Sequence, residues 1–293
     1  RWESTGDRVR YSGFLEHRAT LWANAEREIF SLVTGARVDV DSQFGSQLSP
    51  KLALRWDPEQ HWTFRAGYGR GFRAPSFQEL LLRFENPAVG YVVSGNPGLT
   101  AESSHSVDLS AEYRPSRHWC GATAAVRNDL TDMISTVTVN QPGVPGLLFS
   151  YENIDRARTQ GLETMGIWSP SQLLALTLSY TLTETRNEAL DRPLQGRPLH
   201  RFLFRVVSTH EPTGITASAR GSLSLDRYYF VDSADGSTSQ VTGDPLVQID
   251  LRLAKSFTKN FELFVGVNNL ADAGDAFAVL LPRQFYAGLR GNY

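Results

Sequence analysis

The sequence predicts an all-β fold, a transmembrane antiparallel up-and-down β-barrel of the outer-membrane type. Three observations predict it. Apolar and polar residues alternate with a period of two in many segments, the connections between segments alternate between short and long, and aromatic residues stand beside the short connections. Alternation by itself would also suit a soluble β protein, so the other two observations carry the membrane assignment. Counting one strand per segment gives about 14 strands.

The alternation is clearest in residues 174–183, where leucines and a tyrosine alternate with alanine, serine and threonine. Similar runs begin at residues 51, 62, 107, 215 and 247, and a last run extends from Phe285 to Tyr293. Successive side chains of a strand point to opposite faces, so each run has one apolar and one polar face. No stretch of about 18 apolar residues occurs, so no transmembrane helix is expected.

The connections fall into two classes by length. The short ones are residues 57–60, 114–117, 169–171, 211–214 and 256–259. The long ones are residues 73–103, 140–150, 185–198, 229–244 and 271–283. Outer-membrane barrels have short periplasmic turns and long extracellular loops. The sorting therefore predicts which end of the sheet faces outside, and a soluble sandwich has no reason to show it.

Aromatic side chains recur next to the short connections. They are Trp56, Trp62, Tyr113, Trp119, Trp168, Phe257 and Phe261. Tryptophan and tyrosine are enriched at membrane interfaces, where a ring is half buried in lipid and half in contact with water. A single pair would indicate ordinary packing at strand ends. The recurrence at most short connections favours an interfacial girdle.

Composition and motif searches exclude several function classes. The chain has 293 residues, 29 basic and 31 acidic side chains and a net charge of -2, which does not suggest a nucleic-acid partner. The single cysteine, Cys120, allows no intrachain disulfide and is interpreted as a small strand residue. The six histidines show no metal-ligand spacing, and no G-x-S-x-G motif occurs. We therefore expect no catalytic residues, no metal site and no cofactor.

Six short motifs go beyond the general pattern of a barrel. They are Phe72-Arg73-Ala74-Pro75 after a glycine-rich strand, Asn96-Pro97-Gly98-Leu99, Asn128 to Ile134, Tyr151-Glu152-Asn153 with Gln160 to Glu163, Gly196 to Arg201, and Asn268-Asn269-Leu270-Ala271-Asp272. Together and in this order they resemble the barrel segments of TonB-dependent outer-membrane receptors. Gly98 and Ala271 depart from the residues usual in that family.

This resemblance implies a barrel of about 22 strands around an N-terminal plug domain that contacts TonB. Residues 1–293 then form the C-terminal portion of the barrel, and we expect the plug and the first strands to be absent from this chain. The start of the chain has no apolar export segment, so the signal is expected to have been removed or to lie outside it. The expected location is the outer membrane of a Gram-negative cell, with lipid as one partner.

By resemblance, the expected function is the import of a scarce nutrient with TonB-derived energy, with a ferric siderophore as the first candidate. Aromatic rings could stack on ligand rings, and arginines could meet anionic chelate groups. The candidates from the long connections are Phe77, Arg83, Phe84, Tyr91, Arg186, Arg192, Tyr228, Tyr229 and Phe277. Haem receptors of this family carry a histidine between the two motifs that match 72–75 and 96–99. Residues 76–95 contain none, and His105 lies beyond them.

The family motifs themselves are interpreted as structural. Pro75 lacks the N–H that a strand ladder needs, so it ends the strand that contains Phe72, Arg73 and Ala74. Asn96-Pro97 is a residue pair that favours a turn before the next strand. Asn269-Leu270 begins the last long loop, where an asparagine side chain can form hydrogen bonds to the local backbone.

Two other functions remain open on the sequence. The first is a plug-less pore or a structural membrane scaffold subunit in a larger complex, because no plug sequence is present in residues 1–293. The second is a soluble β protein, because the mean hydropathy is only -0.28. Loop composition does not encode the chemistry of a chelate, so the sequence does not name the nutrient.

Overall fold

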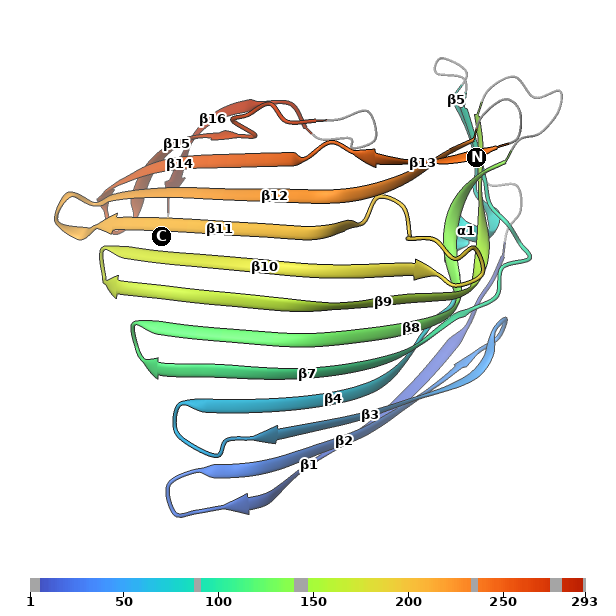
Figure 1. Cartoon of the computed structure of the whole chain (residues 1–293), viewed down its shortest axis with the longest axis horizontal. Coiled ribbons are helices and arrows are strands. Elements are labelled where there is room, and N and C mark those ends of the chain that lie inside the picture. The colour runs from blue at the N-terminus through green and yellow to red at the C-terminus, as the bar shows by residue number, and fades with distance from the viewer. Residues whose placement is uncertain (1–5, 87–90, 140–146, 233–236, 275–280, 292–293) are drawn as a thin grey trace.

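The computed structural model describes residues 6–86, 91–139, 147–232, 237–274 and 281–291. Within these ranges most residues belong to one sixteen-stranded sheet (Figure 1). The elements are β1 (Arg10–Ala23), β2 (Glu28–Asp41), β3 (Gly45–Trp56), β4 (Trp62–Arg73), α1 (Phe77–Leu81), β5 (Arg83–Asn86), β6 (Tyr91–Ser94), β7 (Glu102–Ser116), β8 (Trp119–Val139), β9 (Leu147–Ser171), β10 (Leu174–Asn187), β11 (Pro198–His210), η1 (Glu211–Thr213), β12 (Ile215–Asp232), β13 (Thr238–Gly243), β14 (Leu246–Thr258), β15 (Phe261–Asn268) and β16 (Gln284–Gly291). The predicted all-β, up-and-down architecture is confirmed.

Thirteen strands follow one another along the sheet, each antiparallel to the next, and β5, β6 and β13 lie off this path. The described sheet has sixteen strands where about 14 were predicted. Residues 10–41 form the hairpin β1–β2, which the alternating segments did not identify. Two long connections contain the additional short strands. Among the described residues β1 and β16 are the two ends of the path and do not pair with each other, so the sheet is open.

The apolar side chains of the alternating runs lie on one face and are exposed. Leu109, Leu178 and Leu253 keep 56%, 53% and 50% of their surface accessible. Buried apolar residues are few: Ile29, Ala74, Leu80, Leu99, Ala157, Ala254 and Val267. Because no second layer covers this face in the described chain, an apolar solvent or partner must cover it. No described helix is both long and apolar enough to cross a membrane.

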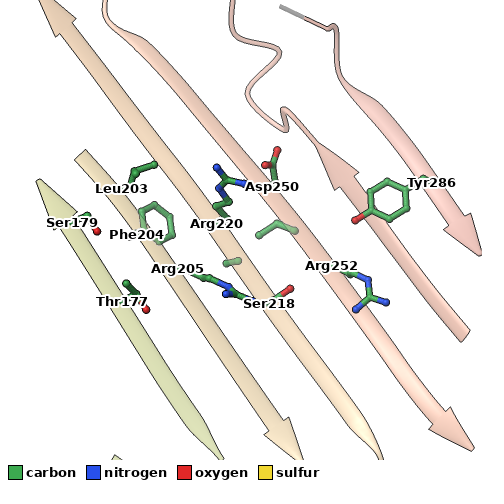
Figure 2. A pocket seen from close by; sticks show the side chains of 12 residues that line it. Thr177, Ser179, Leu203, Phe204, Arg205, Ser218, Arg220, Asp250, Arg252 and Tyr286 are labelled. Atoms are coloured by element: carbon green, nitrogen blue, oxygen red, sulfur yellow. The ribbon is translucent and has the colours of Figure 1, made fainter. Parts of the chain in front are cut away.

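The opposite face is polar. On β10 to β16 it carries Thr177, Ser179, Arg205, Ser218, Arg220, Asp250, Arg252 and Tyr286 (Figure 2). These residues line a hollow of about 460 Å³. The two faces follow directly from the period-two pattern, because directly paired residues of neighbouring strands lie on the same face. Arg205 pairs with Arg220, and Arg220 pairs with Asp250.

The two ends of the sheet differ as the connection lengths predict. The turns β3–β4, β7–β8, β9–β10, β11–β12 and β14–β15 lie at one end, and the long connections lie at the other (Figure 1). The link between β2 and β3 is an exception, because residues 42–44 make a tight turn at the long-loop end. There Asp41 Oδ1 accepts hydrogen bonds from the backbone amides of Gln43 and Phe44 over 2.9 and 3.2 Å.

Some predicted long links are partly strand. The link predicted at 140–150 is shorter, because β8 and β9 stay paired as far as Val139 and Leu148. The link predicted at 229–244 contains β13, which pairs with the end of β12. The link predicted at 73–103 contains α1 and the β5–β6 hairpin, and β6 also pairs with β9 in parallel. Strand pairing therefore extends, at the long-loop end, beyond the segments that simple alternation identifies.

The aromatic residues predicted to lie together do so at the short-turn end. The ring centroids of Trp62 and Tyr113 are 4.5 Å apart, and those of Tyr113 and Trp119 are 5.8 Å apart. Trp119 is paired with Trp168 across β8 and β9. Trp56, Trp119 and Trp168 remain 45%, 39% and 47% exposed. The result is a continuous row of half-exposed aromatic rings across neighbouring strands.

Candidate ligand-binding site

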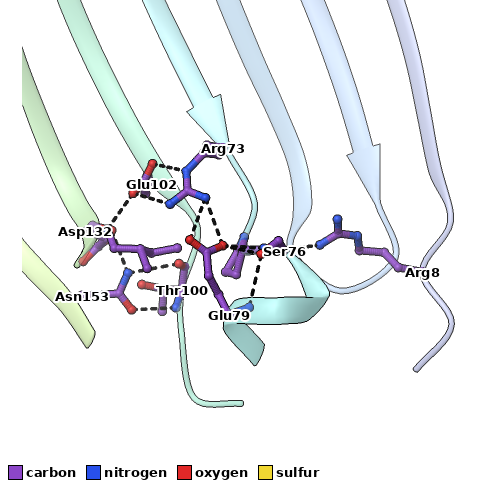
Figure 3. A network of polar contacts seen from close by, with 10 residues as sticks. Arg8, Arg73, Ser76, Glu79, Thr100, Glu102, Asp132 and Asn153 are labelled. Carbon is purple, nitrogen blue, oxygen red and sulfur yellow. Dashed lines mark hydrogen bonds and ion pairs between the residues drawn. The ribbon is translucent and has the colours of Figure 1, made fainter. Parts of the chain in front are cut away.

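Residues of three family motifs, at 72–75, 128–134 and 151–153, meet in one polar network at the long-loop end (Figure 3). Arg73 is its centre. Its Nε donates to Glu102 over 2.5 Å, and its Nη1 donates to Glu79 over 3.0 Å. Glu102 also accepts a hydrogen bond from the backbone amide of Ile134 over 2.6 Å. One guanidinium thus joins the end of β4 to α1, β7 and β8.

The same network fixes the chain after β4. Pro75 is fully buried, and its carbonyl accepts a hydrogen bond from Arg8 Nη1 over 2.6 Å. Ser76 caps α1, because its hydroxyl accepts from the amide of Glu79 while the Glu79 carboxylate accepts from the amide of Ser76. This reciprocal capping box satisfies two amides that a helix start leaves free. β4 ends at Arg73, as predicted from the proline.

Asparagines close the neighbouring connections. The Nδ2 of Asn96 donates to the carbonyl of Tyr151 over 2.8 Å, and its Oδ1 accepts from the amide of Gly98 over 2.9 Å. Asn153 bonds both backbone groups of Thr100 and the carbonyl of Asp132. These contacts tie the 96–99 motif, with Pro97 in its turn, to β8 and β9. They agree with the structural interpretation of the motifs.

Asn269 has a similar role at the last loop. It adopts a left-handed backbone conformation with φ of 51°, is 4% exposed, and its amide donates to Asp250 Oδ1 over 2.9 Å. Its side chain bonds backbone groups of Ala273 and Leu281 at 2.8 to 3.0 Å. Leu270 follows with its amide bonded to the carbonyl of Ile249. The predicted local bonding of this asparagine is confirmed.

Glu79 gives the network a defined pH response. Burial alone would raise the pKa of this carboxyl, but hydrogen bonds from the Ser76 amide and hydroxyl and the charge of Arg73 outweigh burial and lower the pKa. A lowered pKa in the folded state means that the stabilisation is complete at neutral pH. It is lost as the pH falls through that lowered pKa, below the ordinary range of about 4.3 for a glutamic acid.

We therefore expect α1 to loosen in acid. Hydrogen exchange of residues 76–82, corrected for intrinsic rates, is expected to be slow at pH 7 and faster at a pH below the lowered pKa of Glu79, where its carboxylate is protonated. In Glu79→Gln the exchange should be fast at both pH values, because the charge is absent throughout. Equal protection of the native segment at the two pH values would contradict this prediction.

A rim cavity between the β10–β11 connection and β12 gathers three predicted ligand residues. Arg186, Arg192 and Tyr228 line it, and its volume is about 250 Å³. Its other lining residues are Thr183, Glu184, Thr185, Asp191, Pro193, Arg197 and Leu199. Arg197 was not among the predicted ligand residues, although it lies in the same predicted connection. Its residue type and its place in a long connection could have identified it as a candidate.

The charges of this rim cavity favour an anion. Arg186 forms an ion pair with Asp191, so its charge is balanced. The guanidinium of Arg192 lies over the Phe230 ring, 4.2 Å from its centroid, and Arg197 has no ion pair within the described chain. Glu184 accepts a hydrogen bond from the neutral Gln160 over 2.9 Å and keeps its charge, so the three arginines and two acids of the lining leave a net charge of +1. Arg192 and Arg197 are therefore the cations available to a ligand.

Two further predicted residues, Phe84 and Tyr91, form an aromatic cluster with Phe149. The rings of Phe84 and Tyr91 on the β5–β6 hairpin are 5.9 Å apart, and Tyr91 meets Phe149 of β9 edge-on at 6.2 Å. Phe149 was not among the predicted ligand residues, although it lies in the predicted connection 140–150. The neighbouring Arg83 pairs with Glu85 over 2.9 Å. This cluster offers aromatic surface at the rim.

The remaining predicted ligand residues have other roles or cannot be placed. Phe77 packs under the guanidinium of Arg8, 5.2 Å from the ring centroid. The hydroxyl of Tyr229 accepts from Arg227, which is 4% exposed, so this tyrosine supports the β12–β13 region. Phe277 lies outside the described residues. The predicted set therefore separates into the rim cavity, the aromatic cluster and two packing residues.

The metal and haem expectations can be compared with the described chain. No group of three or more potential metal ligands occurs among the described residues. His105 lies on β7, where its Nδ1 is hydrogen-bonded to the Tyr68 hydroxyl over 2.9 Å, and its ring is stacked on that tyrosine. It is therefore part of the strand and lies outside the loop that separates β4 from β7.

Comparison with known proteins identifies the family. A family model described as "TonB dependent receptor-like, beta-barrel" matches residues 2–270. An iron-regulated outer membrane virulence protein of Vibrio cholerae is 32% identical over 204 residues, which are 66% of this chain and 30% of that protein. The vitamin B12 transporter BtuB of Vibrio vulnificus is 26% identical over 276 residues, which are 94% of this chain and 41% of that protein.

Solved structures share the fold. The ferric enterobactin receptor PfeA of Pseudomonas aeruginosa superposes with a TM-score of 0.73 at 21% identity, covering 97% of this chain and 45% of the receptor. The siderophore receptor PirA of Acinetobacter baumannii gives 0.72 at 17% identity, covering 99% and 47%. The chain thus spans less than half the length of these relatives. It is an outer-membrane protein and belongs to the family of TonB-dependent receptors with a β-barrel domain.

Proposed function

We propose that the protein containing this chain imports an anionic ferric siderophore through the outer membrane with energy from TonB. The single observation that carries this proposal is the rim cavity, where Arg192 and Arg197 present unbalanced positive charge beside Tyr228. Arginine binds carboxylate and other oxyanions through paired N–H groups. The names of several relatives, which include siderophore receptors and an iron-regulated protein, support the same substrate class.

The proposal assigns residues 1–293 to the C-terminal portion of a receptor barrel. The open sheet needs further strands to remove its two edges, because lipid offers no hydrogen-bond partners to edge amides. We assign those strands, and a plug that contacts TonB, to other parts of the same protein. The exposed apolar face then meets membrane lipid, and the row of aromatic rings lies at the periplasmic interface.

Receptors and transporters make up the relatives named above, and none of them is named as an enzyme. The alternative of a plug-less pore or a scaffold subunit finds no support among these relatives. Cobalamin is the more serious competitor as a substrate, because one relative is a vitamin B12 transporter. Cobalamin carries little net charge, so the cationic rim cavity favours an anionic ferric siderophore over cobalamin.

A binding panel tests the substrate class. Purified full-length protein is titrated with ferric catecholate, ferric hydroxamate, ferric citrate, haem and cobalamin, and quenching of intrinsic tryptophan fluorescence is recorded. We expect saturable binding of at least one anionic ferric chelate, with no comparable binding of haem or cobalamin. Saturable binding of cobalamin or haem alone would contradict the proposal.

A further inference from the structure

Two arginines face each other on the polar side of the sheet. Arg205 of β11 and Arg220 of β12 are direct partners in the antiparallel register, and both project into the hollow of about 460 Å³ (Figure 2). Directly opposite side chains have Cβ atoms about 5 Å apart, and like charges there are destabilising. Such a pair needs an anion to be favourable.

A second pair of facing arginines in the chain, Arg55 and Arg65, is balanced by carboxylates. Arg55 of β3 and Arg65 of β4 are also direct partners. There Arg55 Nε lies 2.9 Å from Asp57, and Arg65 Nη1 lies 3.3 Å from Glu112. Each of these arginines therefore has a carboxylate from the chain itself. The acids beside this arginine pair form ion pairs with it, whereas the acid beside the other pair, Asp250, forms none within the described chain.

The nearest acidic side chains form no ion pair with Arg205 or Arg220 within the described chain. Asp250 is the register partner of Arg220, but it accepts the Asn269 amide over 2.9 Å and forms no ion pair within the described chain. Glu262 is 2.7 Å from Arg252, whose guanidinium also lies over the Phe264 ring at 4.6 Å. Within the described chain, neither Arg205 nor Arg220 has an ion pair or a side-chain hydrogen bond.

We propose that Arg205 and Arg220 form a binding site for a carboxylate that enters the hollow from outside this chain. Two guanidinium groups on adjacent strands can each donate paired hydrogen bonds to one carboxylate. Ser218, Thr177 and Tyr286 line the same hollow and add hydroxyl groups around it. The site lies on the polar wall, separate from the rim cavity, and does not depend on which nutrient is imported.

Two sources can supply this carboxylate. One is an aspartate or glutamate of a polypeptide segment of the full-length protein that lies against the polar wall. The other is a free carboxylate that enters from solution. The chemistry of the site is the same in both cases. Melting measurements in the absence and presence of a free carboxylate distinguish them.

The sign of a melting shift tests the proposal. The full-length protein in detergent is compared with Arg205→Gln, with Arg220→Gln and with the double variant Arg205→Gln/Arg220→Gln, in HEPES–chloride and in citrate of equal ionic strength. If a carboxylate occupies the site, the variants lose a paired ion and Tm falls by at least about 2 °C. If the two arginines only repel each other, removing them raises Tm.

The buffers separate the sources. A fall of Tm in HEPES–chloride identifies a carboxylate of the protein itself. Stabilisation by citrate of the native protein but not of the variants identifies a free carboxylate. The proposal is overturned if the variants have a higher Tm than the native protein. It is also overturned if their Tm is unchanged and citrate shifts the Tm of variants and native protein equally. Where the source is the protein itself, the difference from the native protein should shrink only as the pH falls through the pKa of that carboxylate, which the two guanidinium groups hold below the ordinary range.

Two further variants control the experiment. Arg55→Gln should lower Tm in HEPES–chloride without any citrate effect, because it leaves Asp57 without its partner in the chain. Arg220→Lys keeps the positive charge but not the planar guanidinium that donates paired hydrogen bonds. Its decrease in Tm should therefore be smaller than that of Arg220→Gln. If the double variant does not fold, the single variants give the same test.

Discussion

Replacing Arg192 and Arg197 together with glutamine is expected to weaken binding of a ferric siderophore to the full-length protein by roughly 100-fold. These side chains carry the unbalanced positive charge of the rim cavity. Their loss removes charge-assisted hydrogen bonds to an anionic chelate. The fold should be retained, because the backbone bonds between Arg192 and Asn187 do not involve the substituted groups.

A graded control accompanies this double variant. Arg186→Gln should weaken binding much less, because the charge of Arg186 is already balanced by Asp191. Affinities are measured by fluorescence titration, and circular dichroism confirms that each variant is folded. Equal affinity of the native protein and of Arg192→Gln/Arg197→Gln would show that the ligand binds elsewhere on the rim.

Replacing Gly161 with valine is expected to prevent assembly of a folded barrel. A Cβ at this position would lie 2.0 Å from the carbonyl oxygen of Leu182 on the neighbouring β10. That atom is backbone, and it cannot move away without breaking the register between β9 and β10, which extends from Leu174 to Asn187. The overlap is far inside van der Waals contact, so strand pairing must give way.

Gly166 provides a matched control on the same strand. A Cβ there meets nothing within 4 Å, so Gly166→Ala should fold normally. Both variants are produced as the full-length protein, and folding is followed by the heat-dependent change of mobility in SDS gels that folded outer-membrane barrels show. A heat-modifiable Gly161→Val protein would contradict the argument from close approach at this position.

Much of the sheet could be predicted because its physical cause is local. A strand exposed to lipid on one side and water on the other must alternate, and residues 174–183 do so without a break. Strand ends could be predicted where backbone chemistry is decisive, as at Pro75 and Asn269. The ends of the sheet could be distinguished because turns and loops differ in length.

Other parts of the fold depend on contacts between distant segments. The parallel pairing of Tyr91 with Leu147 joins two loops that the sequence treats separately. The first hairpin was missed, although Thr34 to Val40 of β2 pair regularly with β1, because its apolar residues are interrupted by Gly35 and charged side chains. Such pairings are set by the neighbouring strands and leave little trace in local pattern.

The candidate site shows the same limit. Arginine and tyrosine in long connections were reasonable candidates, and Arg186, Arg192 and Tyr228 do meet in one cavity. Tyr229 has the same side chain as its neighbour, but it points to the opposite face of β12 and bonds the buried Arg227. Residue type could suggest which side chains bind ligand, whereas strand direction and loop packing decide which of them face the cavity.

Energised uptake of radioactive iron tests the central claim most directly. A strain that lacks the gene is compared with the same strain carrying the full-length gene, and uptake of a ferric siderophore is followed with and without an uncoupler of the inner-membrane proton gradient. We expect saturable uptake that requires the gene and stops when the uncoupler is added. Gene-dependent entry that does not saturate and continues without the gradient would identify a passive pore and contradict this expectation.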